Sequence, residues 1–240
     1  SEGERMIIGA ACSEVFSGPR LAKVLRPAME LQRQALECLE SGSPAPCLSQ
    51  HTSTGVTPAL ELFLERLEPH LPWATARDGV DDWFVTVQLE GASAVWAACD
   101  LLLQLKHRNN DEMLSSHRCK VAVGAHSYHG PGFSSYGSTE PMGPKQHQIK
   151  YPVPSAMARF QGESDEAFHA RMTQEIDEFL DANSHEIGVL LVEPQWGSSL
   201  AAQMWPPQVL RHLVQGAQER GILVCSDEIM CGLGRHGKGT

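Results

Sequence analysis

Acidic side chains follow two apolar runs of the sequence, at places where strands would end. Asp227 and Glu228 come one residue after the run Ile222–Cys225, and Glu193 directly follows the run Ile187–Val192. Short apolar runs are typical of buried parallel strands, and open α/β sheets bind ligands beside the carboxyl ends of their strands. A carboxylate at such a place could pair with a cationic group of a ligand.

A glycine-containing turn lies between an expected strand and an expected helix. The strand is predicted at Trp83–Val87, where aromatic and β-branched residues cluster, and an apolar helix is predicted to reach about Lys106. Gly91 and Ala92 lie in the turn between them. Because backbone N–H groups and the helix dipole both favour an anion at a helix start, this turn could bind a phosphate. Taken alone, the motif is equally well explained by an ordinary turn without a ligand.

Tyr128 and His129 follow a third apolar run, Cys119–Val123, which is also predicted to be a strand. An aromatic ring after a strand end can stack on a flat heteroaromatic ligand. A tyrosine packed within a loop is the alternative. His126 and His129 could instead bind a metal, but two histidines without a third ligand in a recognisable pattern do not favour such a site.

Together these motifs resemble those of the class III (omega-type) aminotransferases, which use pyridoxal phosphate. Residues 227–237 resemble the family signature Asp-Glu-Val-(Gln/Met)-Thr-Gly-Phe-Gly-Arg-Thr-Gly, with the Asp, the Glu, the Arg and all three Gly in register. Residues 128–130 resemble its (Tyr/Phe)-His-Gly motif, and residues 193–197 resemble Glu-Pro-Val-Gln-Gly. The turn at Gly91 resembles its Ser-Gly-Ser/Ala-Glu-Ala-Val motif. The four motifs occur in the order in which the family has them.

The resemblance implies a pyridoxal phosphate site and gives roles to its residues. The cofactor-binding residues would be Gly91, Ala92, Tyr128, His129, Glu193, Asp227 and Ile229. Tyr128 would lie against one face of the pyridine ring and Ile229 against the other. Asp227 would be the catalytic carboxylate, because a negative charge beside the pyridine nitrogen favours its protonated form and strengthens the cofactor as an electron sink. A capping or salt-bridging carboxylate is the alternative for Asp227.

The alternation of strands and helices predicts an α/β fold with a mainly parallel sheet and helices on both of its faces. The resemblance narrows this to the pyridoxal-phosphate-dependent transferase fold type I, in incomplete form. We expect an N-terminal segment at residues 1–55 and the large cofactor-binding domain at residues 56–240. Helices are predicted at 20–39, with Pro27 as a kink or a start, and from residues 58, 164 and 207 onwards. Residues 131–161, rich in Gly and Pro, are predicted to form a long irregular loop.

Composition excludes some classes of partner. The net charge of the 240 residues is -10 and the 19 Lys and Arg are scattered, which argues against a nucleic-acid partner. No apolar run is long enough for a membrane span. Seven widely spaced cysteines without a CxxC motif favour reduced thiols in an intracellular protein, cytoplasmic or organellar. The first residue, Ser1, leads us to expect a processed or trimmed chain.

The lysine expected for transamination has no match among the residues of this sequence. In the family it lies some way after the Asp, whereas this sequence ends at Thr240, and none of its six lysines corresponds to it. We therefore expect a fragment of an aminotransferase whose site is completed by further residues or by another chain. Its substrates would be an amino acid or amine as donor and a keto acid or aldehyde as acceptor, and the resemblance implies a homodimer.

Two other interpretations of the protein's function stay open. A catalytically inactive, aminotransferase-like structural or binding subunit is favoured by Glu90, Met230 and Ser198, which differ from the residues common in the family, and by the unmatched lysine. Ser198 also removes support for the gating of substrate carboxylates by a second glutamate. Nucleotide binding by residues 232–240 is disfavoured, because Gly239 separates Lys238 from Thr240 in what would otherwise resemble a P-loop.

Overall fold

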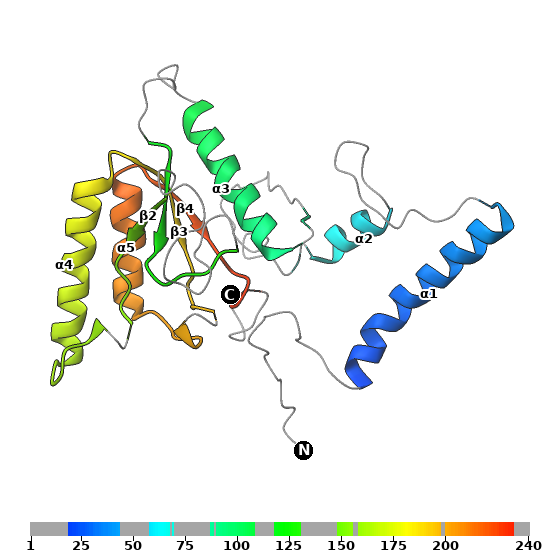
Figure 1. Cartoon of the computed structure of the whole chain (residues 1–240), viewed down its shortest axis with the longest axis horizontal. Coiled ribbons are helices and arrows are strands. Elements are labelled where there is room, and N and C mark those ends of the chain that lie inside the picture. The colour runs from blue at the N-terminus through cyan, green and yellow to red at the C-terminus, as the bar shows by residue number, and fades with distance from the viewer. Residues whose placement is uncertain are drawn as a thin grey trace. The chain divides into compact units, whose positions relative to one another are not determined.

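The structure is a computed structural model that describes residues 19–43, 58–67, 69, 87–88, 90–108, 118–130, 148–155, 158–197 and 200–232. The described elements, in chain order, are α1 (Pro19–Ser41), α2 (Pro58–Leu67), α3 (Gly91–Arg108), β1 (Lys120–Gly124), β2 (Gln148–Tyr151), α4 (Asp165–Asn183), β3 (Ile187–Val192), α5 (Pro207–Glu219) and β4 (Leu223–Ser226) (Figure 1). They fall into two compact units, one reaching residue 85 and the other beginning at residue 86.

In the first unit, the described residues form two helices. Arg33 of α1 pairs with Glu30 and with Glu37, which lie one turn away on either side of it. These contacts are exposed and therefore add little to stability. Pro27 lies inside α1, so the alternative that this helix begins at Pro27 is wrong. Within the part of the chain that the structure describes, we find no helix with the length and apolar character that a membrane span requires.

In the second unit, four parallel strands form one sheet in the order β2-β1-β3-β4. Every residue of β3 is buried, as expected for a central strand of a parallel sheet covered on both faces. The ladder continues past β4, where the Asp227 backbone N–H donates to the Val192 carbonyl at 2.7 Å. The predicted α/β class and the predicted strands at Cys119–Val123, Ile187–Val192 and Ile222–Cys225 are confirmed, with ends shifted by one residue in the first and last.

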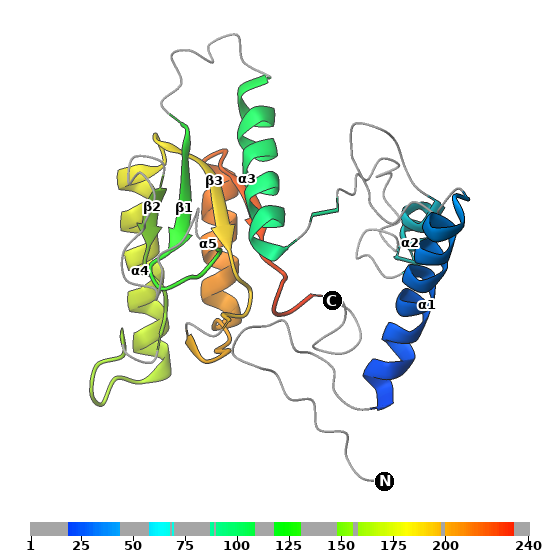
Figure 2. The same ribbon diagram turned by 45° about the vertical axis from the view of Figure 1, so that its right-hand side comes forward.

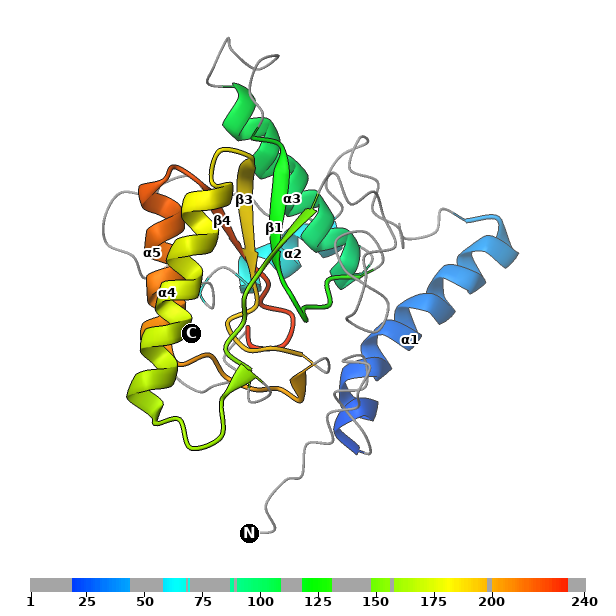
Figure 3. The same cartoon turned by 60° about the vertical axis from the view of Figure 1, so that its left-hand side comes forward.

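Side chains of each strand alternate between two apolar layers, because successive residues of a strand point to opposite faces. On β3, Val189 and Leu191 belong to the layer that contains Val95 and Cys99 of α3. Leu190 belongs to the layer beneath α4 and α5. Accordingly α3 lies on one face of the sheet, while α4 and α5 lie side by side on the other (Figures 1, 2 and 3).

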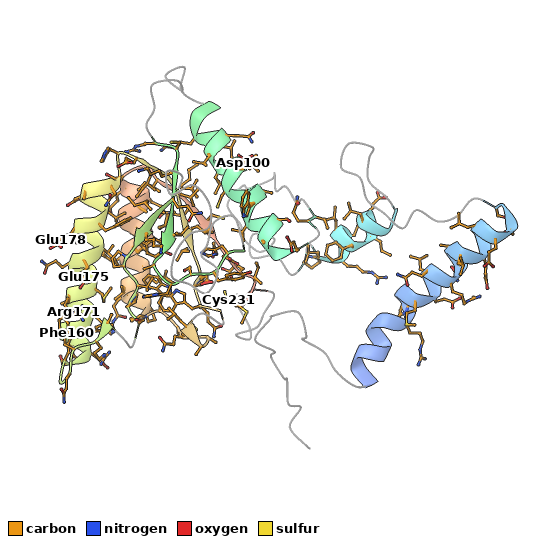
Figure 4. The ribbon with its side chains drawn as sticks, viewed as in Figure 1. Asp100, Phe160, Arg171, Glu175, Glu178 and Cys231 are labelled. Carbon is orange, nitrogen blue, oxygen red and sulfur yellow. The ribbon has the colours of Figure 1, made fainter. Side chains whose placement is uncertain are left out.

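Helix α4 begins where the sequence predicts. Ser164 is its N-cap, and the Ser164 hydroxyl accepts a hydrogen bond from the Ala167 backbone N–H at 3.2 Å. On the outer side of α4, the Arg171 guanidinium lies 4.2 Å from the centre of the Phe160 ring and donates to Glu175 at 2.8 Å (Figure 4). It also donates to Glu163, so one arginine links the segment before α4 to the helix itself.

Strand β2 was not expected. The sequence predicts an irregular loop over residues 131–161, whereas Gln148–Tyr151 pairs in parallel with β1. The strand has four residues and lies at the edge of the sheet. It is too short, and with Gln148 and Lys150 too polar, to show the apolar run of a buried strand. The predicted strand at Trp83–Val87 lies almost entirely outside the described residues.

We expect Leu213→Ala to lower the free energy of unfolding by about 2–5 kcal/mol, because Leu213 is fully buried between α5 and the sheet. Gln215→Ala, on the exposed side of the same helix, is the control and should change stability by no more than about 0.5 kcal/mol. Urea unfolding followed by circular dichroism measures both variants. Equal effects of the two substitutions would contradict the assignment of this core.

Candidate functional site

Three neighbouring strands end at the same edge of the sheet and bring three buried polar side chains together. Glu193 directly follows β3, Asp227 directly follows β4, and His129 lies in the segment after β1. One ligand atom of each residue lies within 4.8 Å of those of the other two. These residues are far apart in the sequence, and the parallel order of the strands makes them neighbours. His126, the other histidine considered above as a metal ligand, is exposed and does not belong to this group.

The Asp227 carboxylate is fixed by two donors. His129 Nδ1 lies 2.7 Å from Asp227 Oδ2, and the Ile229 backbone N–H donates to Asp227 Oδ1 at 3.1 Å. A carboxylate is an acceptor only, so the Nδ1–H of the imidazole is the donor of the first bond. His129 Nε2 is buried and has no hydrogen-bond partner among the described residues. The sequence motif placed His129 beside the site, but its contact with Asp227 is a finding of the structure.

Glu193 is a buried carboxyl beside a second buried carboxyl. Burial, and next the negative charge of Asp227, raise the pKa of Glu193 to about 8. The Gly197 backbone N–H and the nearby Ser127 hydroxyl act in the opposite direction. That hydroxyl has no partner at full hydrogen-bond geometry in the described structure, and the same holds for Glu193 Oε2. We therefore regard the stabilisation from Ser127 as weak.

Aromatic side chains pack on the interior side of the segment that contains Glu193. Trp196 and Trp205 stack with ring centres 4.7 Å apart, and the Trp205 Nε1–H donates to the Glu193 backbone carbonyl at 2.9 Å. Tyr151 of β2 lies beside Trp205, and its hydroxyl donates to the Leu191 carbonyl. These rings exclude water from the inner side of Glu193. Sequence reasoning gave them no role, since nothing in the spacing of Trp196 and Trp205 links them to the site.

The start of α3 lies against two other segments of the site. Gly130 has a φ of +85°, and a Cβ added to it would overlap the Cβ of Ala92. A Cβ added to Gly91 would overlap the side chain of Ile229. The absence of side chains at both glycines therefore allows the loops after β1 and β4 to approach the first turn of α3 closely. The residues predicted to bind phosphate are thus brought next to the residues that hold Asp227.

Tyr128 and Ile229, the two residues expected to flank a ring, are both half-exposed at 47%. Neither is covered by the described part of the chain, so each has an apolar surface available. Their placement on opposite sides of a ring stays a prediction. Glu90 is exposed and accepts a hydrogen bond from the Ser93 hydroxyl at 3.3 Å, so its side chain is engaged at the start of α3.

Thiols surround the strand that carries Asp227. Cys225 of β4 and Cys99 of α3 pack in the same apolar layer, and their mutual interaction lowers the pKa of Cys225 and raises that of Cys99. Cys231 donates to Glu228 at 3.0 Å, and burial raises its pKa to about 12 (Figure 4). The sequence predicted reduced thiols, and Cys99, Cys225 and Cys231 are free and buried. Cys225 and Cys231 are near Asp227 in the sequence, whereas the proximity of Cys99 was visible only in the structure.

A comparison with known families adds to this geometry. The sequence profile described as Aminotransferase class-III matches residues 51–239. The chain belongs to the class III aminotransferase family. This confirms the resemblance seen in the sequence motifs, and pyridoxal phosphate is the cofactor of that family.

Solved transaminases share the fold. A structure described as a transaminase with L-ala is 21% identical, with a TM-score of 0.62 over 92% of this chain and 48% of the other. A PMP-bound aminotransferase from Vibrio fluvialis is 20% identical, with a TM-score of 0.63 over 85% and 44%. A thermostable (S)-enantioselective omega-transaminase from Thermomicrobium roseum is 24% identical, with a TM-score of 0.62 over 88% and 45%. The chain thus spans about half the length of these proteins, in the fold type I arrangement.

The residues present fit pyridoxal phosphate. A buried carboxylate with its charge held in place suits the ring nitrogen, and a helix start reached through two glycines suits the phosphate. The available apolar surfaces of Tyr128 and Ile229 suit the ring faces. Met230 cannot donate a hydrogen bond to the ring hydroxyl as a glutamine would. This difference leaves the rest of the donor set unchanged.

We expect Gly130→Ala to destabilise the protein more than Gly162→Ala. Both glycines have positive φ, which costs an alanine about 1–2 kcal/mol, but a Cβ at Gly162 meets no atom within 4 Å. The overlap of the new methyl group with Ala92 should add about 1–3 kcal/mol at Gly130. Urea unfolding of the two variants compares them directly. If they were equally stable, the close approach to α3 would be refuted.

Proposed function

We propose that this chain forms the cofactor-binding part of a pyridoxal-phosphate-dependent aminotransferase. The observation that carries the proposal is the buried Asp227 carboxylate, fixed by His129 and by the Ile229 backbone N–H beside the start of α3. The family of the chain supports the same chemistry. Its reaction would move an amino group from an amino acid or amine to a keto acid or aldehyde.

In this proposal Asp227 holds a proton on the ring nitrogen of the cofactor. Pyridoxal phosphate supplies an electron sink when it is bound, and the sink is stronger when that nitrogen is protonated. An opposite charge beside a base raises the pKa of the base, so Asp227 maintains the protonated form. His129 orients Asp227 by donating from Nδ1 to one of its carboxylate oxygens. His129 is therefore a positioning residue.

The remaining proposed residues bind and orient. The backbone N–H groups at Gly91 and Ala92 would hold the phosphate at the positive end of α3. Tyr128 and Ile229 would limit tilting of the ring by contact with its two faces. Glu193 would lie beside the ring-nitrogen end of the site. The lysine that holds the cofactor covalently in this family would come from outside residues 1–240, either from the same polypeptide or from a partner, and we propose a homodimer.

A second candidate function is a subunit of this family that binds the cofactor weakly or not at all. Met230, which cannot donate a hydrogen bond as the glutamine of many family members would, and Ser198, which stands where the family often has a glutamate, favour it. Cofactor binding separates the two functions, because only the aminotransferase requires a site for pyridoxal phosphate.

We expect Asp227→Asn to weaken binding of pyridoxal phosphate to the whole native protein by about tenfold to a hundredfold, because it removes a charge-assisted hydrogen bond of about 1.5–3 kcal/mol. Asp177→Asn is the matched control. Asp177 and His212 form a second Asp–His pair with the same separation, 2.7 Å, but on the partly exposed surface between α4 and α5. Absorbance titration with the cofactor measures both variants.

Asp177→Asn should bind the cofactor like the wild type. If the wild-type protein gave no saturable binding, the aminotransferase would be rejected in favour of the non-catalytic subunit. If the two variants bound equally well, Asp227 would lose its proposed role.

A further inference from the structure

The cluster of His129, Glu193 and Asp227 at the strand ends contains two carboxyl groups but only one basic group. Two carboxyls, those of Glu193 and Asp227, are only 5% and 6% exposed, and a single imidazole accompanies them. In the described structure no Lys or Arg forms an ion pair with either carboxyl. Two negative charges in one site that is closed to water repel each other, so the site favours a state in which one of the carboxyls keeps its proton.

The hydrogen bonds identify which carboxyl is charged. Both oxygens of Asp227 accept, one from His129 Nδ1 and one from the Ile229 backbone N–H. Glu193 has a buried oxygen, Oε2, that no donor reaches. An ionised carboxylate is costly to bury without donors, whereas a neutral carboxylic acid in the same place costs much less. The arrangement therefore stabilises charge on Asp227 and a proton on Glu193.

We propose that Glu193 is protonated in the native protein at neutral pH, which leaves Asp227 as the one charged carboxylate of the cluster. Glu193 is then a positioning residue for Asp227: it fills the neighbouring position without adding a second charge. This protonation state does not depend on the proposed function. Its consequence for the cofactor does rest on that function, because a proton on Glu193 leaves Asp227 as the one charge beside the ring nitrogen.

The neighbours of Glu193 from each packed segment agree with this assignment. Asp227 contributes a negative charge, and His129, itself titratable, is engaged with Asp227. Tyr151 of β2 has its pKa raised well above the usual value by burial and by the charges of Glu193 and Asp227, so it stays neutral. The buried Cys231 thiol, with a pKa of about 12, is neutral as well. Together with the raised pKa of Glu193, about 8, these neighbours leave one net negative charge when His129 is neutral.

The proposal predicts a proton that can be observed without any cofactor. In the cofactor-free native protein at pH 7, infrared spectroscopy should show the carbonyl stretch of a buried protonated carboxyl. The band should disappear in Glu193→Gln and should fade in the wild type as the pH passes about 8. Glu178→Gln, the same change at an exposed position of α4, is the control and should retain the band (Figure 4).

Asp227→Asn gives a second test that keeps Glu193 in place. It removes the charge that contributes to the raised pKa of Glu193, while burial continues to act. The carboxyl band should therefore disappear at a lower pH than in the wild type. An unchanged midpoint would contradict the coupling between the two carboxyls.

The stability of the fold supplies an independent readout. In the unfolded chain Glu193 loses its proton near its ordinary value of 4.5, and in the folded chain near 8. Between these values Glu193 binds more protons in the folded state than in the unfolded state, so its contribution to the free energy of unfolding should fall as the pH rises and should level off above about 8. Glu193→Gln removes this contribution, so the stability difference between variant and wild type should change across that pH window.

These outcomes separate the two proposals. If a folded wild-type protein at pH 7 showed no band that Glu193→Gln removes, and a stability difference independent of pH, Glu193 would be ionised and this inference would be overturned. The proposal that the protein binds the cofactor would not be contradicted by this result. If the band were present but pyridoxal phosphate did not bind, the proposed function would fail and the protonation of Glu193 would stand.

Discussion

The hydrogen bond between His129 and Asp227 is the interaction on which the site depends. It joins the segment after β1 to the end of β4, two segments that β3 separates in the sheet. Burying a carboxylate is unfavourable unless donors satisfy it, and the imidazole N–H and one backbone N–H do so here. The contact therefore allows a charge to exist in the interior and fixes where the charge is.

The apolar layers on the two faces of the sheet keep water from screening the charge of Asp227. Water on the inner side of the segment that contains Glu193 would screen the Asp227 carboxylate. The stacked Trp196 and Trp205 occupy that space instead. On the other face of the sheet, Cys99 of α3 packs in one apolar layer with Cys225 of β4, and the first turn of α3 approaches the segment after β4 at Gly91 and Ile229. The apolar layers thus do more than stabilise the fold. They hold a helix start and a carboxylate at a separation that the sequence alone would not set.

Much of the fold follows from sequence because its signals are local. The apolar run Ile187–Val192 and the Ser164 cap are features of a few adjacent residues, and the structure contains the strand and the helix they predict. Strand β2 was not predicted, because an edge strand that contains Gln148 and Lys150 has no apolar run. It is defined by its pairing with β1, which is a long-range property.

The site shows the same division between local and long-range information. Asp227, Glu193 and His129 could be selected from motifs, since each directly follows a recognisable strand or lies in a short family motif. The partner of His129, the contact of Ala92 with Gly130 and the role of Trp205 could not, because each joins segments far apart in the sequence. Residue type indicates what chemistry is available, whereas packing decides which groups act on one another.

Comparison of the two Asp–His pairs shows why burial matters more than contact. Asp177 and His212 approach as closely as His129 and Asp227, at 2.7 Å in each case, but their side chains remain 45% and 36% exposed. Water and ions screen the surface pair, so it has little influence beyond its own atoms. The buried pair acts through a medium of low polarity, in which its charge raises the pKa of Glu193 and reaches Tyr151. The same two residue types thus form a minor surface contact in one place and the electrostatic centre of a site in another.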